Sequence, residues 1–325
     1  MSVPSVSVVI PAFNAFASLA QTIASVQAQT CTDWEALIID DGSTDGTATL
    51  VRELQARDSR LRLLSVPNRG VSAARNRGVA ETHSPLIAFL DADDLWHPDK
   101  LRFHVECHAR QAELGVSFAK VGFLSPDGKP TGLVASHPQH ALRPVDFICE
   151  NPTTTTSNWV LRREVFETVG GFDEAMSYSE DLEWLLRVAC YGAWRIAPID
   201  RVLTYYRTSS GGLSSSLQRM EQGWLRLISK ARCYAPGLVE SNFATAQAVH
   251  LRYLARRSLR LQDDPAAGAD FLLRALRSDW RLLIREPRRT GLTALAVFAR
   301  LLEHNCRNCY PSARRLPRQH PDANP

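Results

Sequence analysis

Three carboxylates follow directly on a short apolar run, and they have the clearest chemical potential in this chain. The run, residues 86–90, reads Leu-Ile-Ala-Phe-Leu, and Asp91, Asp93 and Asp94 come after it. Such a run is typical of a buried parallel strand, whose carboxyl end opens into a ligand crevice. Clustered carboxylates there would suit Mg²⁺ or Mn²⁺, ions that usually serve phosphate-bearing substrates. An acidic turn that begins the next helix explains these residues equally well at this point.

A second carboxylate pair, Glu180 and Asp181, follows Ser179 and precedes a helical apolar pattern. Serine is a favoured helix cap, so we expect Ser179 to cap a helix with both acids in its first turn. The helix dipole favours the ionised carboxylate there, which is the form that a general base needs. The alternative is that both acids only stabilise the start of the helix.

The elements that must position these groups alternate between strand and helix. Strands are expected over 6–10, 34–40, 61–66 and 86–90, with helical patterns between them. This alternation predicts an α/β fold with a mostly parallel central sheet flanked by helices. Because ligands bind beyond the carboxyl ends of such strands, Phe13–Asn14, Asp40–Asp41 and Asp91–Asp94 are expected to share one site.

The pattern changes along the chain and predicts three parts. Residues 1–216 are expected to form the catalytic domain, and 217–310 a C-terminal helical extension, since the chain looks helical from about Leu217. Residues 311–325 are rich in Pro, Arg and polar residues, which predicts a disordered tail.

Composition narrows the class of protein. The apolar fraction of 45% and the charged fraction of 22% are those of an ordinary folded protein. No run of 18 apolar residues predicts a membrane span, and the start of the chain does not resemble a signal peptide. Seven scattered cysteines fit a reducing compartment, so we expect a cytoplasmic protein. Nucleic acid is not an expected partner, because no recognition module appears.

Positive charge is concentrated near the C-terminus. From Leu251 onward the chain has 15 Arg and 7 acidic residues, a balance of +8, whereas the whole chain carries +4. This asymmetry suggests peripheral contact of the C-terminal helices with an anionic or lipid surface, on the inner face of the plasma membrane. Residues 291–302 would form the interfacial helix. A compositional preference for arginine, with that helix packed onto the body, is the alternative.

Six blocks of residues follow one another along the chain: Val6–Asn14, Asp40–Thr47, Asn68–Asn76, Leu90–Asp94, Gly170–Asp173 and Glu180–Asp181. In this order they closely resemble family 2 glycosyltransferases, and the resemblance covers roughly Val6 to Arg207. Any one block would be weak evidence, but their order is highly specific.

The resemblance implies a GT-A (Rossmann-like) fold that transfers a sugar, with inversion, from a nucleoside-diphosphate sugar to a hydroxyl of a glycan or lipid-linked acceptor. Uridine is the favoured base, and cell-surface polysaccharide or glycolipid assembly the expected role. Asp181 would be the catalytic base, and Asp91 and Asp93 would hold the divalent cation (Mn²⁺ or Mg²⁺). The residues that the resemblance places at the donor are Pro11, Phe13, Asn14, Asp41, Arg75 and Asp91.

The segment that follows Arg207 departs from the family pattern. In the family, a histidine that helps to hold the metal or diphosphate often follows the Tyr-Arg pair. Here Ser209 stands near that place, after Tyr206-Arg207.

Two other functions remain open. A sugar-nucleotide nucleotidyltransferase would need a glycine-rich phosphate-binding loop after the first strand. The segment there, Pro11–Asn14, is not glycine-rich. A non-catalytic nucleotide-binding protein would not need Asp91, Asp93 and Asp181 together.

Overall fold

The computed structural model describes residues 3–135, 138–208, 216–261 and 265–309, without the side chains of 305–309. The chain forms two compact units, Met1–Phe243 and Ala244–Pro325. The predicted division after residue 216 stays a prediction, but α8 (Leu217–Tyr234) belongs to the first unit. The indole N–H of Trp224 on α8 donates to the Ile148 carbonyl at 2.9 Å, which fixes this helix to that unit.

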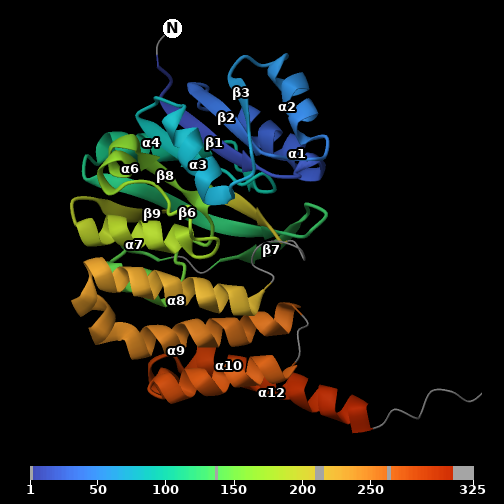
Figure 1. Ribbon diagram of the computed structural model, residues 1–325, viewed down its shortest axis with the longest axis vertical. Helices are drawn as coiled ribbons and strands as arrows, with labels where there is room; N and C mark the ends of the chain where they lie inside the picture. The colour runs from blue at the N-terminus through green and yellow to red at the C-terminus, as the bar shows by residue number, and fades with distance from the viewer. Residues whose placement is uncertain (1–2, 136–137, 209–215, 262–264, 310–325) are drawn as a thin grey trace, which may run out of the picture. The chain divides into compact units, whose positions relative to one another are not determined.

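The first half of the first unit has the predicted alternation of strand and helix, coloured blue to teal in Figure 1. Each predicted strand is present, with bounds shifted by at most two residues. The elements are β1 (Val6–Ala12), α1 (Phe16–Gln27), β2 (Trp34–Asp41), α2 (Thr47–Gln55), β3 (Leu61–Val66), α3 (Val71–Ala80) and β4 (Leu86–Phe89).

The second half of this unit contains the remaining strands of the sheet, including the two longest, β6 and β9, and further helices. These elements are β5 (Leu95–Trp96), α4 (Lys100–Arg110), β6 (Leu114–Leu124), β7 (Pro130–Val134), α5 (Pro144–Cys149), the 3₁₀ helix η1 (Thr156–Asn158), β8 (Val160–Arg162), α6 (Arg163–Val169), α7 (Glu180–Tyr191) and β9 (Arg195–Arg207).

Within the described residues, all strands join one sheet in the order β3-β2-β1-β4-β8-β6-β9-β5, and β7 pairs with β6. The four strands β3-β2-β1-β4 are parallel, with Ala12 opposite Asp40 and Val9 opposite Phe89. Strand β8 is antiparallel to both β4 and β6, whereas β9 is parallel to β6. The predicted α/β class and its parallel sheet are confirmed, and the carboxyl ends of β1, β2 and β4 lie along one edge.

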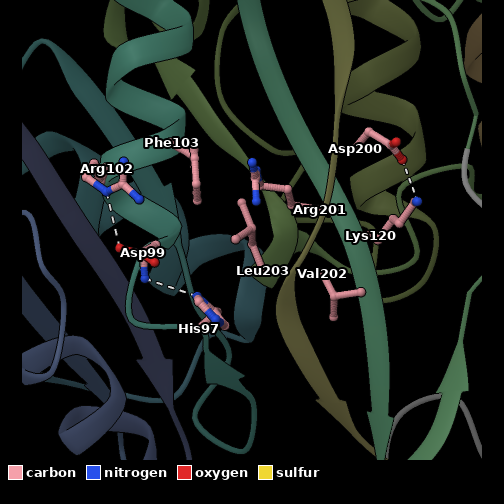
Figure 2. A pocket seen from close by; sticks show the side chains of 9 residues that line it. All are labelled: His97, Asp99, Arg102, Phe103, Lys120, Asp200, Arg201, Val202 and Leu203. Atoms are coloured by element: carbon pink, nitrogen blue, oxygen red, sulfur yellow. Dashed lines mark hydrogen bonds and ion pairs between the residues drawn. The ribbon is translucent and has the colours of Figure 1, made fainter.

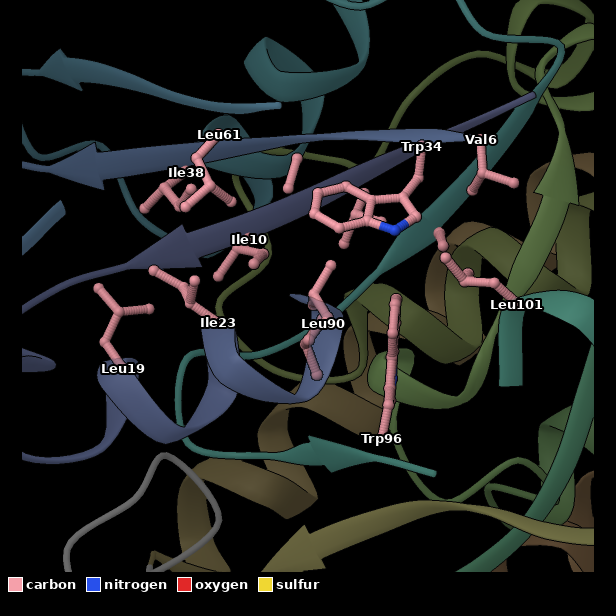
Figure 3. Packing of buried hydrophobic residues seen from close by; sticks show 14 of the residues in the cluster. Val6, Ile10, Leu19, Ile23, Trp34, Ile38, Leu61, Leu90, Trp96 and Leu101 are labelled. Carbon is pink, nitrogen blue, oxygen red and sulfur yellow. The ribbon is translucent and has the colours of Figure 1, made fainter. Parts of the chain in front are cut away.

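Residues that alternate along the strands bury two separate apolar faces. On one face Ile38 of β2 packs with Leu19 and Ile23 of α1, as Figure 3 shows. On the other face Leu37 and Ile39 pack against Ala74 of α3. This two-sided burial explains why β2 reads as a continuous apolar run, since neither of its faces meets water.

Helix α3 lies unusually close to β1 because a glycine faces the strand. A Cβ at Gly78 would sit 2.3 Å from Cγ1 of Val9, a separation that real carbon atoms do not adopt. Asn76, on the same helix, bonds the Phe172 backbone at both its carbonyl and its amide, each at 2.8 Å. These two contacts fix α3, which carries Arg75, against the sheet on one side and the segment before α7 on the other.

The second unit is helical. Helix α9 (Pro236–Leu261) begins in the first unit and ends in the second, which also contains α10 (Pro265–Ser278), α11 (Leu282–Arg285) and α12 (Pro287–Cys309). In the described part of the chain, no helix combines the length and apolar character needed to cross a membrane. The predicted tail, 311–325, lies outside the described residues.

Candidate functional site

The loops after β1 and β2 are tied together at the sheet edge. The Asn14 side-chain oxygen accepts a hydrogen bond from the Thr44 amide at 2.8 Å, and the Asn14 amide donates to Oγ of Ser43 at 2.9 Å. Asn14 has a φ of 48°, in the left-handed region that asparagine tolerates better than most residues. Pro11 is buried at the end of β1, whereas Phe13 is 53% exposed. An exposed phenylalanine at this edge offers an aromatic surface to a ligand.

Asp41, at the end of β2, holds the turn before α3. Its two carboxylate oxygens accept hydrogen bonds from the amides of Arg69 and Gly70, both at 2.9 Å. Each oxygen keeps a second lone pair, so Asp41 can still accept a bond from a ligand. The structure thus places the predicted donor residues Pro11, Phe13, Asn14 and Asp41 on the same edge.

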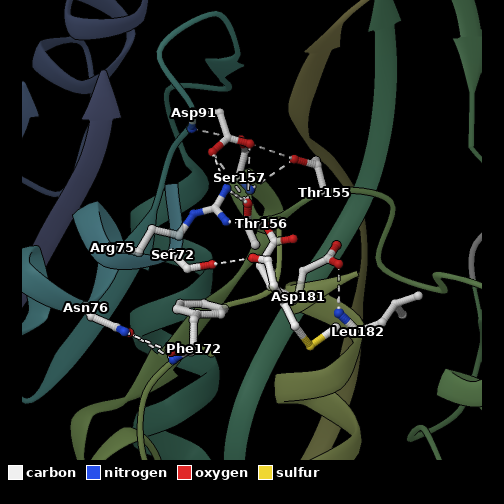
Figure 4. Close-up of polar contacts among 12 residues, drawn as sticks. Ser72, Arg75, Asn76, Asp91, Thr155, Thr156, Ser157, Phe172, Asp181 and Leu182 are labelled. Atoms are coloured by element: carbon white, nitrogen blue, oxygen red, sulfur yellow. Dashed lines mark hydrogen bonds and ion pairs between the residues drawn. The ribbon is translucent and has the colours of Figure 1, made fainter. Parts of the chain in front are cut away.

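A buried arginine joins the two carboxylate clusters, as Figure 4 shows. Arg75, on α3, bonds Oδ1 of Asp91 at 2.7 Å and Oε1 of Glu180 at 3.0 Å, and it donates to Oγ1 of Thr156 at 2.7 Å. Asp91 comes directly after the β4 region, and Glu180 begins α7. Residues more than 100 positions apart therefore meet at one guanidinium.

The charges in this cluster depend on one another. Burial alone would lower the pKa of Arg75, but Asp91 and Glu180 outweigh that effect and raise it. Burial, together with the neighbouring Asp181 carboxylate, raises the pKa of Glu180 to about 7, although Arg75 opposes the shift. Arg75 is therefore charged at every physiological pH, and Glu180 titrates near neutrality.

The turn after Asp91 is held from two sides. Hydroxyl groups on α1 donate to the Ala92 carbonyl, Ser18 at 2.9 Å and Thr22 at 3.0 Å. From the end of β9, the amide of Arg207 donates to the Asp94 carboxylate at 3.0 Å, and its Nε donates to the Asp93 carbonyl at 2.9 Å. The Asp-x-Asp turn is thus fixed by protein contacts before any ligand arrives.

Of the carboxylates in this turn, Asp91 alone forms an ion pair within the described residues, with Arg75. Burial and the nearby Asp91 raise the pKa of Asp93 to about 6, and burial also raises the pKa of the fully buried Asp94. In the described part of the chain, no side chain donates a hydrogen bond to the Asp93 carboxylate. A cation at Asp93 would relieve this repulsion.

Asp181 lies on the first turn of α7, half-buried. Its Oδ2 accepts a bond from the side-chain amide of Asn151 at 2.8 Å, and its Oδ1 accepts one from the Leu182 amide at 2.8 Å. Burial raises the pKa of Asp181, while the Leu182 amide and Arg75 lower it. The result is an oriented carboxylate with more than ordinary basicity.

The prediction that Ser179 caps α7 was wrong. Ser179 has a φ of 60°, in the left-handed region, and its side chain makes no capping hydrogen bond. A serine cap needs an extended backbone so that its hydroxyl can reach the second or third amide of the helix. Here the Arg75 contact to Glu180, rather than a cap, fixes the start of the helix.

Residues 151–158 contribute to the site, although they are not among the predicted site residues. The Ser157 hydroxyl accepts a bond from the Asp91 amide at 3.0 Å, and Thr156 lies between Asp91 and Arg75. Asn151 orients Asp181 and is itself fixed by the amides of Thr153 and Thr154, both at 3.0 Å from its oxygen. The run of four threonines in this segment was the signal that could have indicated it.

A separate groove of about 700 Å³ lies between α4, β6 and β9, and it lacks the predicted site residues (Figure 2). Phe103 lines it between the guanidinium groups of Arg102 and Arg201, and Lys120 pairs with Asp200. The lining of this groove reaches Leu203, four residues before Arg207 on β9, but it includes none of the carboxylates of the Asp91–Asp94 turn.

Comparison with known proteins identifies the chain. Residues 7–170, just over half of its length, match the sequence model of Glycosyl transferase family 2. The chain belongs to this family. A putative teichuronic acid biosynthesis glycosyltransferase, TuaG of Bacillus subtilis, is 34% identical over 128 residues, which are 39% of this chain and 50% of TuaG. The hyaluronan synthase of Pasteurella multocida is 27% identical over 196 residues, which are 59% of this chain and 19% of the synthase. The family 2 chain thus spans half or less of these curated relatives.

Solved structures show the same fold. A mannosyltransferase from Pyrobaculum calidifontis, solved with GDP-Man and Mn²⁺, aligns with a TM-score of 0.56 at 19% identity, over 96% of this chain and 89% of that one. Residues 1–349 of TarS from S. aureus, solved with UDP-GlcNAc, align with a TM-score of 0.55 at 16% identity, over 84% and 89% of the two chains. The predicted GT-A fold of this family 2 member is therefore confirmed.

Two predicted features of the metal site, the roles of Asp91 and Asp93 and the replacement of a histidine by Ser209, remain untested. In the part of the chain that the structure describes, no group of three or more His, Cys, Asp or Glu side chains is arranged to hold a metal ion. The metal roles of Asp91 and Asp93 therefore remain predictions. Ser209, at the place where the family often has a histidine, lies outside the described residues, as does the rest of 209–215.

Proposed function

We propose that this protein is a metal-dependent, inverting glycosyltransferase that uses a nucleoside-diphosphate sugar, with a UDP-sugar favoured. The observation that carries the proposal is the bridge that Arg75 makes between Asp91 and Glu180, because it brings the Asp-x-Asp turn beside the α7 carboxylates. Asp181 is the neighbour of Glu180 on that helix. A leaving-group site and a base are thereby within reach of one substrate.

The donor nucleotide fits along the edge formed by β1 and β2. Phe13 presents its exposed ring for stacking against the base, and the second lone pairs of the Asp41 carboxylate can accept a bond from the base N–H. Asn14 fixes the loop that carries Phe13. This edge leads to Asp91, where the diphosphate would lie. Relatives whose solved structures hold UDP-GlcNAc and GDP-Man support a sugar nucleotide as the ligand class.

The residues at the Asp-x-Asp turn suit a divalent cation. Asp91 and Asp93 supply the hard oxygen ligands that Mn²⁺ and Mg²⁺ prefer, and burial together with the neighbouring Asp91 raises the pKa of Asp93, an effect that a bound cation would counteract. When bound, the cation would offset negative charge that develops on the departing diphosphate. The solved mannosyltransferase with GDP-Man and Mn²⁺ supports this assignment.

The assignment of Asp93 as a metal ligand predicts that its substitution weakens Mn²⁺ binding. Asp93→Asn is expected to weaken Mn²⁺ binding at least tenfold, because an amide is a poorer and uncharged ligand (order of magnitude). Electron paramagnetic resonance of free Mn²⁺ during titration of the protein measures this directly, without turnover. Asp33→Asn, which makes the same change before β2 at the opposite end of the strands, should bind Mn²⁺ normally. Equal affinities of the two variants would contradict the role of Asp93.

The chain's own groups account for the transfer step. The Asp181 carboxylate takes the proton of the acceptor hydroxyl as that oxygen attacks the anomeric carbon, and the bond from this carbon to the diphosphate oxygen breaks. Attack from the face opposite the diphosphate inverts the configuration. Asn151 and the Leu182 amide hold the base in place, while burial strengthens its basicity. The nucleoside diphosphate and one glycosidic bond are the products.

The test is a screen of nucleotide sugars with Mn²⁺ that detects release of nucleoside diphosphate, with and without glycan and lipid-linked acceptors. We expect a UDP-sugar to give the highest rate, and the rate to rise with an acceptor from polysaccharide or glycolipid assembly. Pyrophosphate exchange into a sugar nucleotide would instead identify a nucleotidyltransferase. Binding of donor with neither hydrolysis nor transfer would favour a non-catalytic nucleotide-binding protein.

A further inference from the structure

The helical second unit leaves large apolar side chains uncovered. Trp280 and Ile284 of the α11 region are exposed, as are four residues of α12. We call this set the α11–α12 apolar face: Trp280, Ile284, Leu292, Leu295, Phe298 and Leu302. An exposed apolar set of this size marks a surface that contacts something else.

The α12 members of this face lie on one side of the helix. Their spacing of three, three and four residues keeps Leu292, Leu295, Phe298 and Leu302 within about a third of the helix circumference. The opposite side of α12 is buried, with Thr290, Thr293 and Val297 turned into the unit. The helix therefore already packs through one side, so its second apolar side is left for a partner.

Charge indicates which partner suits this face. Residues 244–325 contain 15 Arg and 7 acidic residues, a balance of +8, which leaves −4 on the remainder of the chain. Arg288 precedes Leu292 and Leu295 by four and seven residues, so it lies on the same side of α12. Within the described residues Arg288 makes no ion pair, whereas Arg281 and Arg285 share Asp279. The part of the chain that carries the apolar face thus has an excess of positive charge, and Arg288 lies on the apolar side of α12.

We propose that the α11–α12 apolar face docks on an anionic lipid surface. An amphipathic helix binds such a surface by inserting its apolar side at the boundary of headgroups and acyl chains, while arginines meet the lipid phosphates. A second copy of this chain is a poorer partner, because two units that each carry +8 would repel each other. This surface is separate from the proposed transferase site, so its test does not depend on sugar transfer.

The experiment is flotation of the full chain with vesicles, using matched pairs of substitutions. Leu295→Gln/Phe298→Gln removes two side chains of the face that are 67% and 59% exposed. The control, Leu133→Gln/Tyr191→Gln, removes side chains that are 65% and 59% exposed in the first unit. Because all four side chains are exposed, both double variants should keep the fold, which circular dichroism verifies. The vesicles are pure phosphatidylcholine, or phosphatidylcholine with about a third phosphatidylglycerol.

We expect the unsubstituted chain and the control to float with the phosphatidylglycerol vesicles, and the Leu295/Phe298 variant to bind them about tenfold more weakly. Binding to pure phosphatidylcholine should be much weaker for all three proteins. Equal flotation of the two double variants, or equal binding to both vesicle types, would overturn the proposal. Self-association without vesicle binding, measured by sedimentation velocity and lost in the Leu295/Phe298 variant, would overturn it in favour of a second copy.

Discussion

Asp181→Asn is expected to lower kcat by about 10²- to 10⁴-fold, the usual contribution of a general base. The substitution removes the group that accepts the acceptor proton and keeps one oxygen, which can still accept the bond from either the Leu182 amide or the Asn151 side-chain amide. The start of α7 is also fixed independently, through the bond of Arg75 to Glu180. We therefore expect the variant to fold normally and to bind donor with unchanged affinity.

Turnover of the variant is measured by release of nucleoside diphosphate at saturating donor and acceptor, and donor affinity by calorimetry. Asp33→Asn is the matched control, since it makes the same chemical change on an exposed residue before β2. The expected pattern is a loss of kcat in Asp181→Asn alone. Near-normal turnover in that variant would remove Asp181 from the role of base, and a loss of donor affinity would assign it to donor binding instead.

The parallel part of the fold could be predicted because the sequence pattern there has one interpretation. All but one of the residues of β2 are buried, and such continuous apolar runs alternating with helical patterns favour a parallel sheet covered by helices. The same reasoning placed Asn14, Asp41 and Asp91 together, since strand direction alone decides which ends meet. Hydrogen bonds between the loops after β1 and β2 confirm their convergence.

The rest of the site depends on contacts that local sequence does not encode. Thr156 and Ser157 reach Asp91 from a loop 65 residues away, and nothing in their own pattern indicates that distance. Ser179 is the reverse case, because its local pattern predicted a cap that the structure does not have. There a long-range contact, from Arg75 to Glu180, determines the backbone in place of local capping. Arg207 is similar, since its hold on Asp93 and Asp94 requires β9 to return beside β5.

Arg75→Met is expected to lower the free energy of unfolding of the first unit by about 3–5 kcal/mol, the usual cost of removing one partner of a buried ion pair. The side chain of Arg75 is 5% exposed and bonds Asp91, Glu180 and Thr156. Methionine fills much of its volume but leaves two carboxylates close together without a cation. Urea unfolding followed by tryptophan fluorescence measures this, because Trp280 alone of the seven tryptophans lies outside the first unit.

The partner of Arg75 makes this loss depend on pH. Glu180 has a pKa of about 7 in the fold against an ordinary value of 4.5, so the folded state binds more protons between these values and stability falls as pH rises through them. Arg75 opposes that shift, so its removal raises the pKa of Glu180 further and extends the fall to higher pH. The gap in stability between the two proteins should therefore be wider at about pH 8 than at about pH 6. Arg75→Met/Glu180→Gln removes one of the two unpaired carboxylates and should recover part of the loss at the higher pH. A gap that is independent of pH, or a double variant no more stable than Arg75→Met, would mean that Arg75 acts through packing on the Phe172 ring instead of through the charge of Glu180.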